Sequence, residues 1–285
     1  MAIHLCQKSY GTIKIYIKVI MHLESICMNA LPVVKEAGMF VAENRRQIPW
    51  GEIEKKGDRD FVTSIDKKSE RLLVKGLSAI LPEAGFFTEE KTVEQGDSSL
   101  RWVVDPIDGT TNFIHRTPVT AVSVALMDGD DLLIGIVYEV TLDELFYSWK
   151  DAGTSFCNSE EIHVSDCSEF RKALVATGFP YQREGRLPAI LETAGYFLEH
   201  CQDIRRFGSA ATDLCYVACG RMDIYYESYL QLWDVAAGIL IVRNAGGTVV
   251  DFSGSEHLTG QQVLATNGRF IEESLSGIRI PPITR

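Results

Sequence analysis

The spacing of predicted strands and helices changes about halfway along the chain, and this change most constrains the fold. Before it, strand-like apolar runs cover residues 119–126, 132–140 and 145–149 and are joined by short turns, which predicts antiparallel hairpins. After it, predicted strands alternate with predicted helices, which favours a mixed sheet covered by helices. We therefore predict a layered α/β fold with two lobes, residues 21–152 and residues 153–285.

Two helices are predicted ahead of the hairpins, at residues 24–45 and 66–80, because apolar residues recur there at helical spacing. Pro32 leaves open a first helix that begins at the proline, and Asp66 is predicted to be the N-cap of the second. Residues 49–60 are predicted to be a loop. In the second lobe we expect strands at 174–177, 222–226, 248–252 and 263–266, and helices at 187–201, 209–219, 234–245 and from 269 onward.

Residues 1–20 do not fit this pattern. Lysines are scattered among their Ile and Tyr residues, so they lack the uninterrupted apolar stretch of a secretory signal. A second methionine, Met21, opens the first helical pattern. We expect residues 1–20 to be an extension outside the two lobes.

Charge and cysteine content exclude several classes of protein. The chain has 28 Lys and Arg against 39 Asp and Glu, a net charge of −11, which argues against general binding to nucleic acid or to an anionic membrane. Its apolar runs fall short of the ~20 residues that a membrane span requires. The seven cysteines are scattered without a C-x-x-C pair. We therefore expect reduced thiols in a cytoplasmic protein.

The segment that carries chemistry is residues 102–113, Trp-Val-Val-Asp-Pro-Ile-Asp-Gly-Thr-Thr-Asn-Phe. A buried strand delivers Asp105, a stiff turn follows at the proline, and Asp108 returns close enough for both carboxylates to hold one or two cations. Gly109 leaves the backbone open to a ligand, and the amides of residues 109–111 precede a predicted helix start. Carboxylates suited to a metal thus stand beside amides suited to a phosphate.

Two further acidic features are ambiguous by themselves. Glu89 and Glu90 follow an apolar pair at a predicted strand end, where a solvated loop is the alternative. Asp234 opens an almost wholly apolar helix, where simple helix capping is the alternative. If these acids gather with Asp105 and Asp108, a hard cation must hold them, because carboxylates ~4 Å apart repel by about 4 kcal/mol at an effective dielectric near 20.

In these segments the chain resembles the inositol monophosphatase family of lithium-sensitive, magnesium-dependent phosphatases, which have the fructose-1,6-bisphosphatase-like fold. The resemblance covers residue 21 to the C-terminus and implies a layered αβαβα sandwich, with an antiparallel sheet in the first lobe and a mixed sheet in the second. It departs from the family at Thr88, where glycine is frequent, and at Asn244, where an acid is frequent. The matching segments are residues 60–63 with Asp66, 88–90, 102–113, 208–210, 225–227, 233–238 and 245–247.

The resemblance also implies roles for individual residues. Glu89, Asp105 and the carbonyl of Ile107 would hold a first Mg²⁺, and Asp105, Asp108 and Asp234 a second. A third, weaker ion would bind Glu89 through water. The cofactor expected is therefore two or three Mg²⁺ ions.

The remaining implied roles concern the reaction and the substrate. Thr110, hydrogen-bonded to Asp60, would orient or deprotonate the attacking water, with Glu89 or Glu90 assisting. Gly109, Thr110 and Thr111 would bind the phosphate. The alcohol part of the substrate would contact Ala210 and Glu227, alongside Asp108 and Asp234.

The function that the resemblance implies is hydrolysis of inositol monophosphate, or of a similar small sugar or polyol phosphate, by metal-activated water in a homodimer. The alternatives are a fructose-1,6-bisphosphatase, a 3′(2′),5′-bisphosphate nucleotidase, or a regulatory protein on this scaffold, since some bacterial relatives are thought to act on the transcription machinery. Glu227 matches the family's inositol-contacting position, which favours inositol 1-phosphate over the adenosine bisphosphate.

Overall fold

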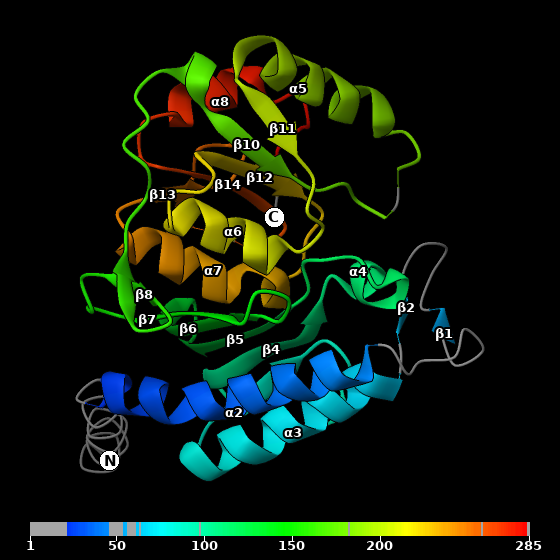
Figure 1. Cartoon of the computed structure of the whole chain (residues 1–285), viewed down its shortest axis with the longest axis vertical. Coiled ribbons are helices and arrows are strands. Elements are labelled where there is room, and N and C mark those ends of the chain that lie inside the picture. The colour runs from blue at the N-terminus through cyan, green and yellow to red at the C-terminus, as the bar shows by residue number, and fades with distance from the viewer. Residues whose placement is uncertain are drawn as a thin grey trace, which may run out of the picture.

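The chain folds into five layers that alternate helices and sheets (Figure 1). The computed structural model describes residues 22–45, 54–55, 61–62, 64–96, 98–181, 183–257 and 259–283. From one end, the layers are a helix pair, a seven-stranded sheet, a second helix pair, a five-stranded sheet and a third helix pair. This confirms the αβαβα sandwich expected from the sequence.

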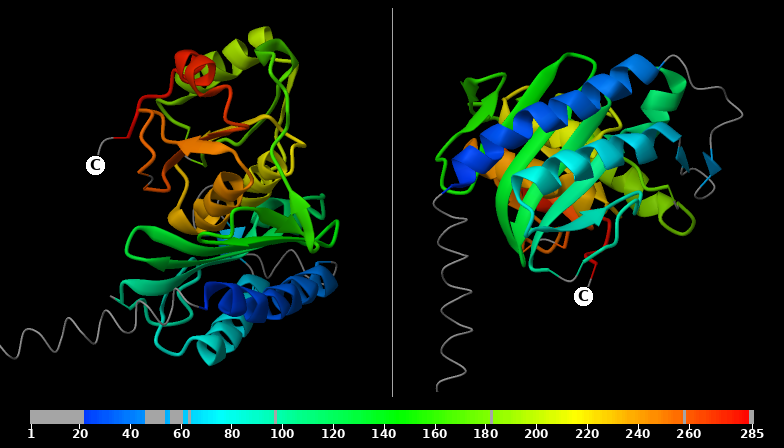
Figure 2. Two further views of the ribbon diagram at one scale, coloured as in Figure 1. Left: turned by 90° about the vertical axis from the view of Figure 1, so that its left-hand side faces the viewer. Right: turned by 90° about the horizontal axis from the view of Figure 1, so that it is seen from below.

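The first layer contains α2 (Leu23–Asn44) and α3 (Ser64–Ile80), which pack on the outer face of the seven-stranded sheet (Figure 2). Pro32 lies inside α2, so the alternative of a helix that begins at the proline is wrong. Asp66 is also not the N-cap of α3, because the helix starts at Ser64 and places Asp66 in its first turn, buried.

Among the described residues one helix, α2, is long and apolar enough to cross a membrane by length and composition alone. Its buried side chains belong to the same core cluster as those of the seven-stranded sheet. Gly38 permits close packing there, because a Cβ at this position would collide with the ring of Tyr138 on the sheet. These contacts are those of a core helix.

The second layer is the seven-stranded sheet, whose strands follow chain order from β3 to β9. All neighbours are antiparallel except β3 and β4, which run parallel. The strands are β3 (Gly85–Thr88), β4 (Leu100–Asp108), β5 (Ala121–Asp128), β6 (Asp131–Glu139), β7 (Glu144–Trp149), β8 (Ser155–Cys157) and β9 (Glu160–Ile162). The sheet therefore continues to Ile162, and the division into lobes near residue 152 stays a prediction.

Most of the predicted loop at 49–60 lies outside the described residues, apart from a short antiparallel pair between β1 (Glu54–Lys55) and β2 (Phe61–Val62). Residues 1–20 also lie outside them. A short helix, α4 (Thr110–His115), follows β4 directly.

The mixed sheet of the fourth layer has the order β11-β10-β12-β14-β13, with β10 parallel to both of its neighbours and the remaining pairs antiparallel. Its strands are β10 (Leu174–Thr177), β11 (Asp203–Arg205), β12 (Ile224–Ser228), β13 (Thr248–Val250) and β14 (Gln262–Thr266). The helices of this half are α5 (Leu187–His200), α6 (Ala210–Ala218), α7 (Leu232–Asn244) and α8 (Ile271–Gly277), with the 3-10 turn η2 (Phe170–Lys172).

The middle layer, α6 and α7, is buried between the two sheets (Figure 2). Gly135 on β6 lies so close to α7 that an added Cβ would be 2.5 Å from the carbonyl oxygen of Ala237. Because α7 is held directly against the first sheet, residues at its N-terminal end are brought beside the ends of β4 and β5. This contact positions the site described next.

Candidate active site

The carboxylates of Asp105 and Asp108 lie at the end of β4, where the pairing with β5 shifts register between them. The shift forms a tight turn in which the Ile107 amide donates to Asp105 Oδ1 at 2.9 Å. Gly109 follows with φ of 87°, and an added Cβ would lie 3.0 Å from the carbonyl oxygens of Val119 and Gly208. Only glycine satisfies both conditions, so the turn leads without obstruction into α4.

Asp108 connects the first sheet to the N-terminal end of α6. Its Oδ2 accepts hydrogen bonds from Ser209 Oγ and from the Ala211 amide, each at 2.7 Å. Ser209 is the N-cap of α6, so the same residue caps the helix and fixes the carboxylate. Asp108 is thereby held between two layers that are distant in sequence.

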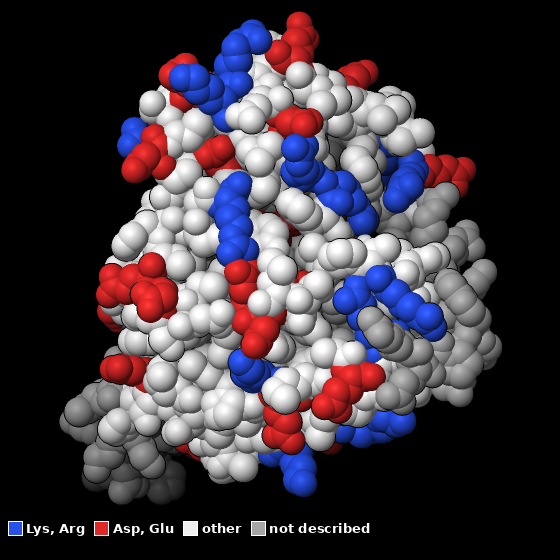
Figure 3. All heavy atoms as spheres, viewed as in Figure 1, with Lys and Arg blue, Asp and Glu red and all other residues white. Residues whose placement is uncertain are grey.

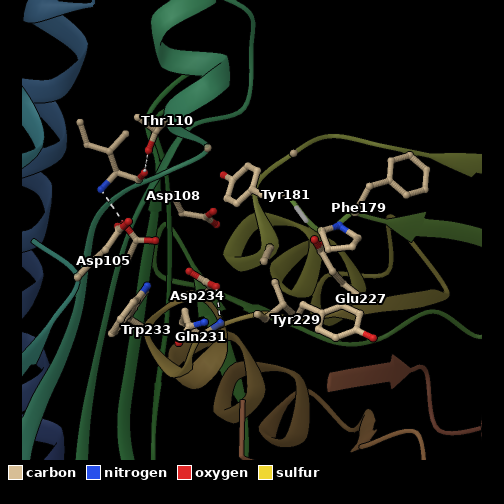
Figure 4. Close-up of a pocket in the computed structure, with 18 of the residues that line it drawn as sticks. Asp105, Asp108, Thr110, Phe179, Tyr181, Glu227, Tyr229, Gln231, Trp233 and Asp234 are labelled. Carbon is tan, nitrogen blue, oxygen red and sulfur yellow. Dashed lines mark hydrogen bonds between the residues drawn. The ribbon is translucent and has the colours of Figure 1, made fainter. Parts of the chain in front are cut away.

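Asp234 comes from the middle layer and lies in the first turn of α7. The N-cap of this helix is Gln231, so the prediction that Asp234 itself is the N-cap is wrong. Asp234 Oδ2 instead accepts from the Gln231 amide at 2.7 Å, which closes a capping box. One carboxylate oxygen is engaged in capping, and Figure 4 shows the group facing the same space as Asp105 and Asp108.

These three aspartates line one cavity of about 210 Å³ between the first sheet and the second half of the chain (Figure 4). Of the residues predicted for the site, the cavity is lined by Glu89, Asp105, Ile107, Asp108, Gly109, Thr110, Ala210, Glu227 and Asp234. Glu90 and Thr111 are not among its lining residues. Asp60 lies outside the described residues, so its predicted hydrogen bond to Thr110 stays a prediction.

Burial and mutual repulsion perturb the carboxyls of this cavity. Burial raises the pKa of Asp105 well above its ordinary value, and the negative charges of Glu89, Asp108 and Asp234 raise it further. Burial likewise raises the pKa of Asp234 far above the usual range, followed by the charge of Asp108. For Asp108 burial raises the pKa to about 6, although its hydrogen bonds from Ser209 and Ala211 act in the opposite direction.

These acids fit a hard divalent cation in ligand chemistry, because every donor is an oxygen and their repulsion is what a cation would relieve. Within the described part of the chain, no group of three or more His, Cys, Asp or Glu is positioned to hold a metal ion in this conformation.

Glu227 lies on the side of the cavity formed by the second half of the chain. Burial raises the pKa of this carboxyl to about 7. The Tyr225 hydroxyl donates to Glu227 Oε2 at 2.9 Å, and an added Cβ at Gly178 would collide with the same carboxylate. Glu227 is thus held in one orientation at the pocket wall.

Sequence reasoning missed one buried residue that supports the site. Glu70 on α3 is fully buried, and its two carboxylate oxygens accept from the amides of Glu90 and Thr92 at 2.7 and 2.6 Å. It therefore anchors the segment that carries Glu89 into the cavity. An acidic residue at a position of the helix that faces the core could have indicated this role in the sequence.

Sequence reasoning also missed the wall formed by residues 178–181 and Tyr229, which lines the cavity opposite the acids. Their aromatic side chains are typical of any core, and the sequence pattern alone does not place them at a cavity. A contact within the turn is also not predictable from the sequence pattern: Thr110 Oγ1 donates to the Ile107 carbonyl at 2.9 Å.

The raised carboxyl pKa values predict a stability that depends on pH and on divalent cation. The folded protein holds protons on Asp108 and Glu227 up to about pH 6 and 7, whereas unfolded carboxyls lose theirs near pH 4. Without cation, the free energy of unfolding should therefore fall as the pH rises from about 4 to 7. Thermal unfolding from pH 5 to 8 measures this.

The matched variant is Glu227→Gln, which should flatten part of the pH dependence above pH 6, and added Mg²⁺ should raise the Tm most at high pH. A cation-free Tm that rises between pH 5 and 8 would contradict the proposed electrostatics.

Comparison with known proteins identifies related chains. The model of the inositol monophosphatase family matches residues 22–279. A curated relative, the Nus factor SuhB of Haemophilus influenzae, is 37% identical over 252 residues, which cover 88% of this chain and 94% of the relative.

Two solved structures have the same fold. The extragenic suppressor protein suhB of Bartonella henselae superposes with a TM-score of 0.81 at 34% identity, covering 88% of this chain and 97% of that one. An inositol monophosphatase from Anabaena (Nostoc) sp. superposes with a TM-score of 0.80 at 31% identity, covering 92% of this chain and 98% of that one.

Proposed function

The chain belongs to the inositol monophosphatase family, and from that premise we propose that it is a magnesium-dependent phosphomonoesterase. Its substrate would be inositol monophosphate or a similar small sugar or polyol phosphate, and its products the alcohol and inorganic phosphate. The observation that supports this most is the gathering of Asp105, Asp108 and Asp234 from two layers around one cavity. Burying these acids together costs free energy unless a cation relieves their repulsion, since the charges of Asp108 and Asp234 raise the pKa of Asp105 and the charge of Asp108 raises that of Asp234.

In this proposal the acids and amides of the cavity hold the reacting groups in place. Glu89, Asp105 and the Ile107 carbonyl would hold one Mg²⁺, and Asp105, Asp108 and Asp234 another, with a third near Glu89. Bound Mg²⁺ lowers the pKa of an attacking water and stabilises the leaving oxygen. No side-chain nucleophile is required.

The other residues would position water and substrate. Thr110 would orient the water, with Asp60 and with Glu89 or Glu90 assisting. Backbone amides of residues 109–111 would bind the phosphate oxygens, because they stand at the start of α4. Ala210 and Glu227 would contact the alcohol, and Glu227 is oriented for this by Tyr225.

The expected partners are part of the same proposal. They are a small phosphorylated alcohol as substrate and a second copy of the chain in a homodimer. We do not expect general binding to nucleic acid or binding to a membrane. On the face shown in Figure 3, the described Lys and Arg side chains lie in small groups among Asp and Glu, without one broad basic surface. This supports a small-molecule substrate rather than general nucleic-acid binding, and we propose a cytoplasmic location as a separate part of the same hypothesis.

A substrate panel with and without Mg²⁺ tests the proposal. We expect phosphate release that requires Mg²⁺, is inhibited by lithium, and is faster in kcat/KM for inositol 1-phosphate than for adenosine 3′,5′-bisphosphate or fructose 1,6-bisphosphate. A higher kcat/KM for either bisphosphate would favour the corresponding alternative. Absence of Mg²⁺-dependent release from every compound would contradict a phosphatase.

The comparisons favour a second candidate function, a regulatory role on this scaffold. The curated relatives at 36–37% identity are named Nus factors rather than phosphatases. A variant without the metal ligand Asp105 separates the two functions. If Asp105→Asn has lost phosphate release but retains full Nus-factor activity in a purified assay, the regulatory role does not depend on catalysis.

A further inference from the structure

Two acid-bearing segments leave the first sheet side by side, at the ends of the parallel strands β3 and β4. The register of these strands ends with Thr88 opposite Val104. One more hydrogen bond follows, from the Glu89 amide to the Val104 carbonyl at 3.1 Å, which places Glu89 beside Asp105. Strand pairing stops there, so contacts from outside the sheet hold the segments that follow.

Glu70 holds the segment that follows β3. It lies on α3, which packs against β4 (Figure 1), and it is fully buried. Its Oε2 accepts from the Glu90 amide at 2.7 Å, and its Oε1 accepts from the Thr92 amide at 2.6 Å. Removing a carboxylate from water costs free energy unless hydrogen bonds compensate, and these two amides supply that compensation. Residues 90–92 are therefore fixed at two points.

Ser69, the neighbouring residue of α3, holds the turn that follows β4. It is also fully buried, and its Oγ donates to the Pro106 carbonyl at 3.3 Å. Pro106 lies between Asp105 and Asp108, where the pairing of β4 with β5 shifts register. Two consecutive residues of one helix thus hold the two segments that carry acids into the cavity.

Gln95 closes the segment after β3 from its other end. Its Oε1 accepts from the Thr88 amide at 2.7 Å, and its Nε2 donates to Thr88 Oγ1 at 3.2 Å and to the Val93 carbonyl at 2.9 Å. Glycine, which is frequent in the family at position 88, would lack this hydroxyl. Between the two points of attachment, Lys91 has a φ of 52°, in the left-handed region. The contacts of Glu70 and Gln95 impose this conformation.

We propose that Ser69 and Glu70 are positioning residues for magnesium. By holding the two segments at a fixed separation, they set the affinity for the ion that Glu89, Asp105 and the Ile107 carbonyl would share. The inference rests on the proposed function, which assigns that ion to these ligands. Neither Ser69 nor Glu70 lines the cavity, so both act through the backbone that they hold. Groups that orient metal ligands change metal affinity or activity by roughly 10- to 100-fold.

The test is calorimetric titration of the full chain with Mg²⁺, which needs no turnover. Glu70→Gln keeps the size of the side chain but replaces one acceptor oxygen with an NH₂ group that faces an amide donor. At least one Mg²⁺ should bind about tenfold more weakly to this variant than to wild type. Ser69→Ala removes one long hydrogen bond and should weaken binding about threefold.

Phosphate release separates positioning from a general loss of structure. The Mg²⁺ concentration for half-maximal rate should rise by the same factors as the Kd, while kcat at saturating Mg²⁺ and KM for inositol 1-phosphate stay within about twofold of wild type. Glu83→Gln is the matched control, because Glu83 is exposed just after α3 and does not line the cavity. It should change neither the Kd nor the rate.

Thermal unfolding without Mg²⁺ shows whether each variant folds. If Glu70→Gln does not fold, Ser69→Ala and Gln95→Ala decide the inference, because they loosen the same two segments without altering the buried carboxylate. Gln95→Ala should also weaken Mg²⁺ binding.

Folded variants that bind Mg²⁺ as tightly as wild type would overturn the inference, as would a loss of kcat that excess Mg²⁺ does not restore. If wild type binds Mg²⁺ but releases no phosphate from any compound, the proposed phosphatase function fails, and the titration still decides the role of Ser69 and Glu70. A wild type that binds no Mg²⁺ would overturn both.

Discussion

Asp105→Asn should abolish Mg²⁺-dependent phosphate release, with a loss of about 10³-fold or more in kcat/KM. Replacing a residue that only orients a metal ligand costs 10- to 100-fold, and Asp105 is proposed to hold two ions itself. The substitution also removes the carboxyl whose pKa is raised by burial and by Glu89, Asp108 and Asp234. Phosphate release and thermal unfolding of the same preparations measure both effects.

The Tm distinguishes a variant that has lost activity but still folds from a variant that no longer folds. Without Mg²⁺ near pH 8, Asp105→Asn should be at least as stable as wild type, because one buried charge is gone, while the rise in Tm on adding Mg²⁺ should disappear. Asp130→Asn removes an equal charge from an exposed turn and should change neither property. Full activity of Asp105→Asn would contradict the assignment of Asp105 as a metal ligand.

Gly135→Val should destabilise the protein by about 3 kcal/mol, the largest stability effect that we expect from a single substitution. A Cβ at this position would lie 2.5 Å from the Ala237 carbonyl oxygen, and relieving that contact requires a shift of the backbone of the buried helix α7. The change pushes α7 away from β6 and so displaces Asp234 from Asp105 and Asp108. Thermal unfolding should show a Tm lower by roughly 5–10 °C.

Gly195→Ala is the matched control, because this glycine lies within α5 and an added Cβ would meet no atom within 4 Å. Alanine has the higher helix propensity, so this variant should gain roughly 0.5–1 kcal/mol. A Gly135→Val protein as stable as wild type would show that α7 can shift relative to the sheet. It would then also weaken the argument that close packing positions Asp234.

Local patterns in the sequence were sufficient to predict most helices and strands of the fold. The apolar runs in residues 119–149 and the short turns between them predicted the hairpins of β5, β6 and β7, because strand pairing across short turns is a local property. The strands β8 and β9 were missed, since each has only three residues and no measurable alternation. The predicted helix starts at Asp66 and Asp234 lie two residues after the observed starts of α3 and α7. An acid in the first turn of a helix is stabilising, as an acid at the N-cap is, so the sequence does not distinguish the two positions.

The sequence by itself determined which residues carry the chemistry at one end of the cavity. Asp105, Asp108 and Gly109 lie within five residues of each other, so their geometry follows from one strand end and its turn. Only the tertiary structure decided that Asp234 joins them, because that contact depends on how closely α7 packs on β6. The wall of residues 178–181 and Tyr229 is likewise a tertiary property, since only the packing of the second half of the chain against the end of β4 makes these residues line a cavity.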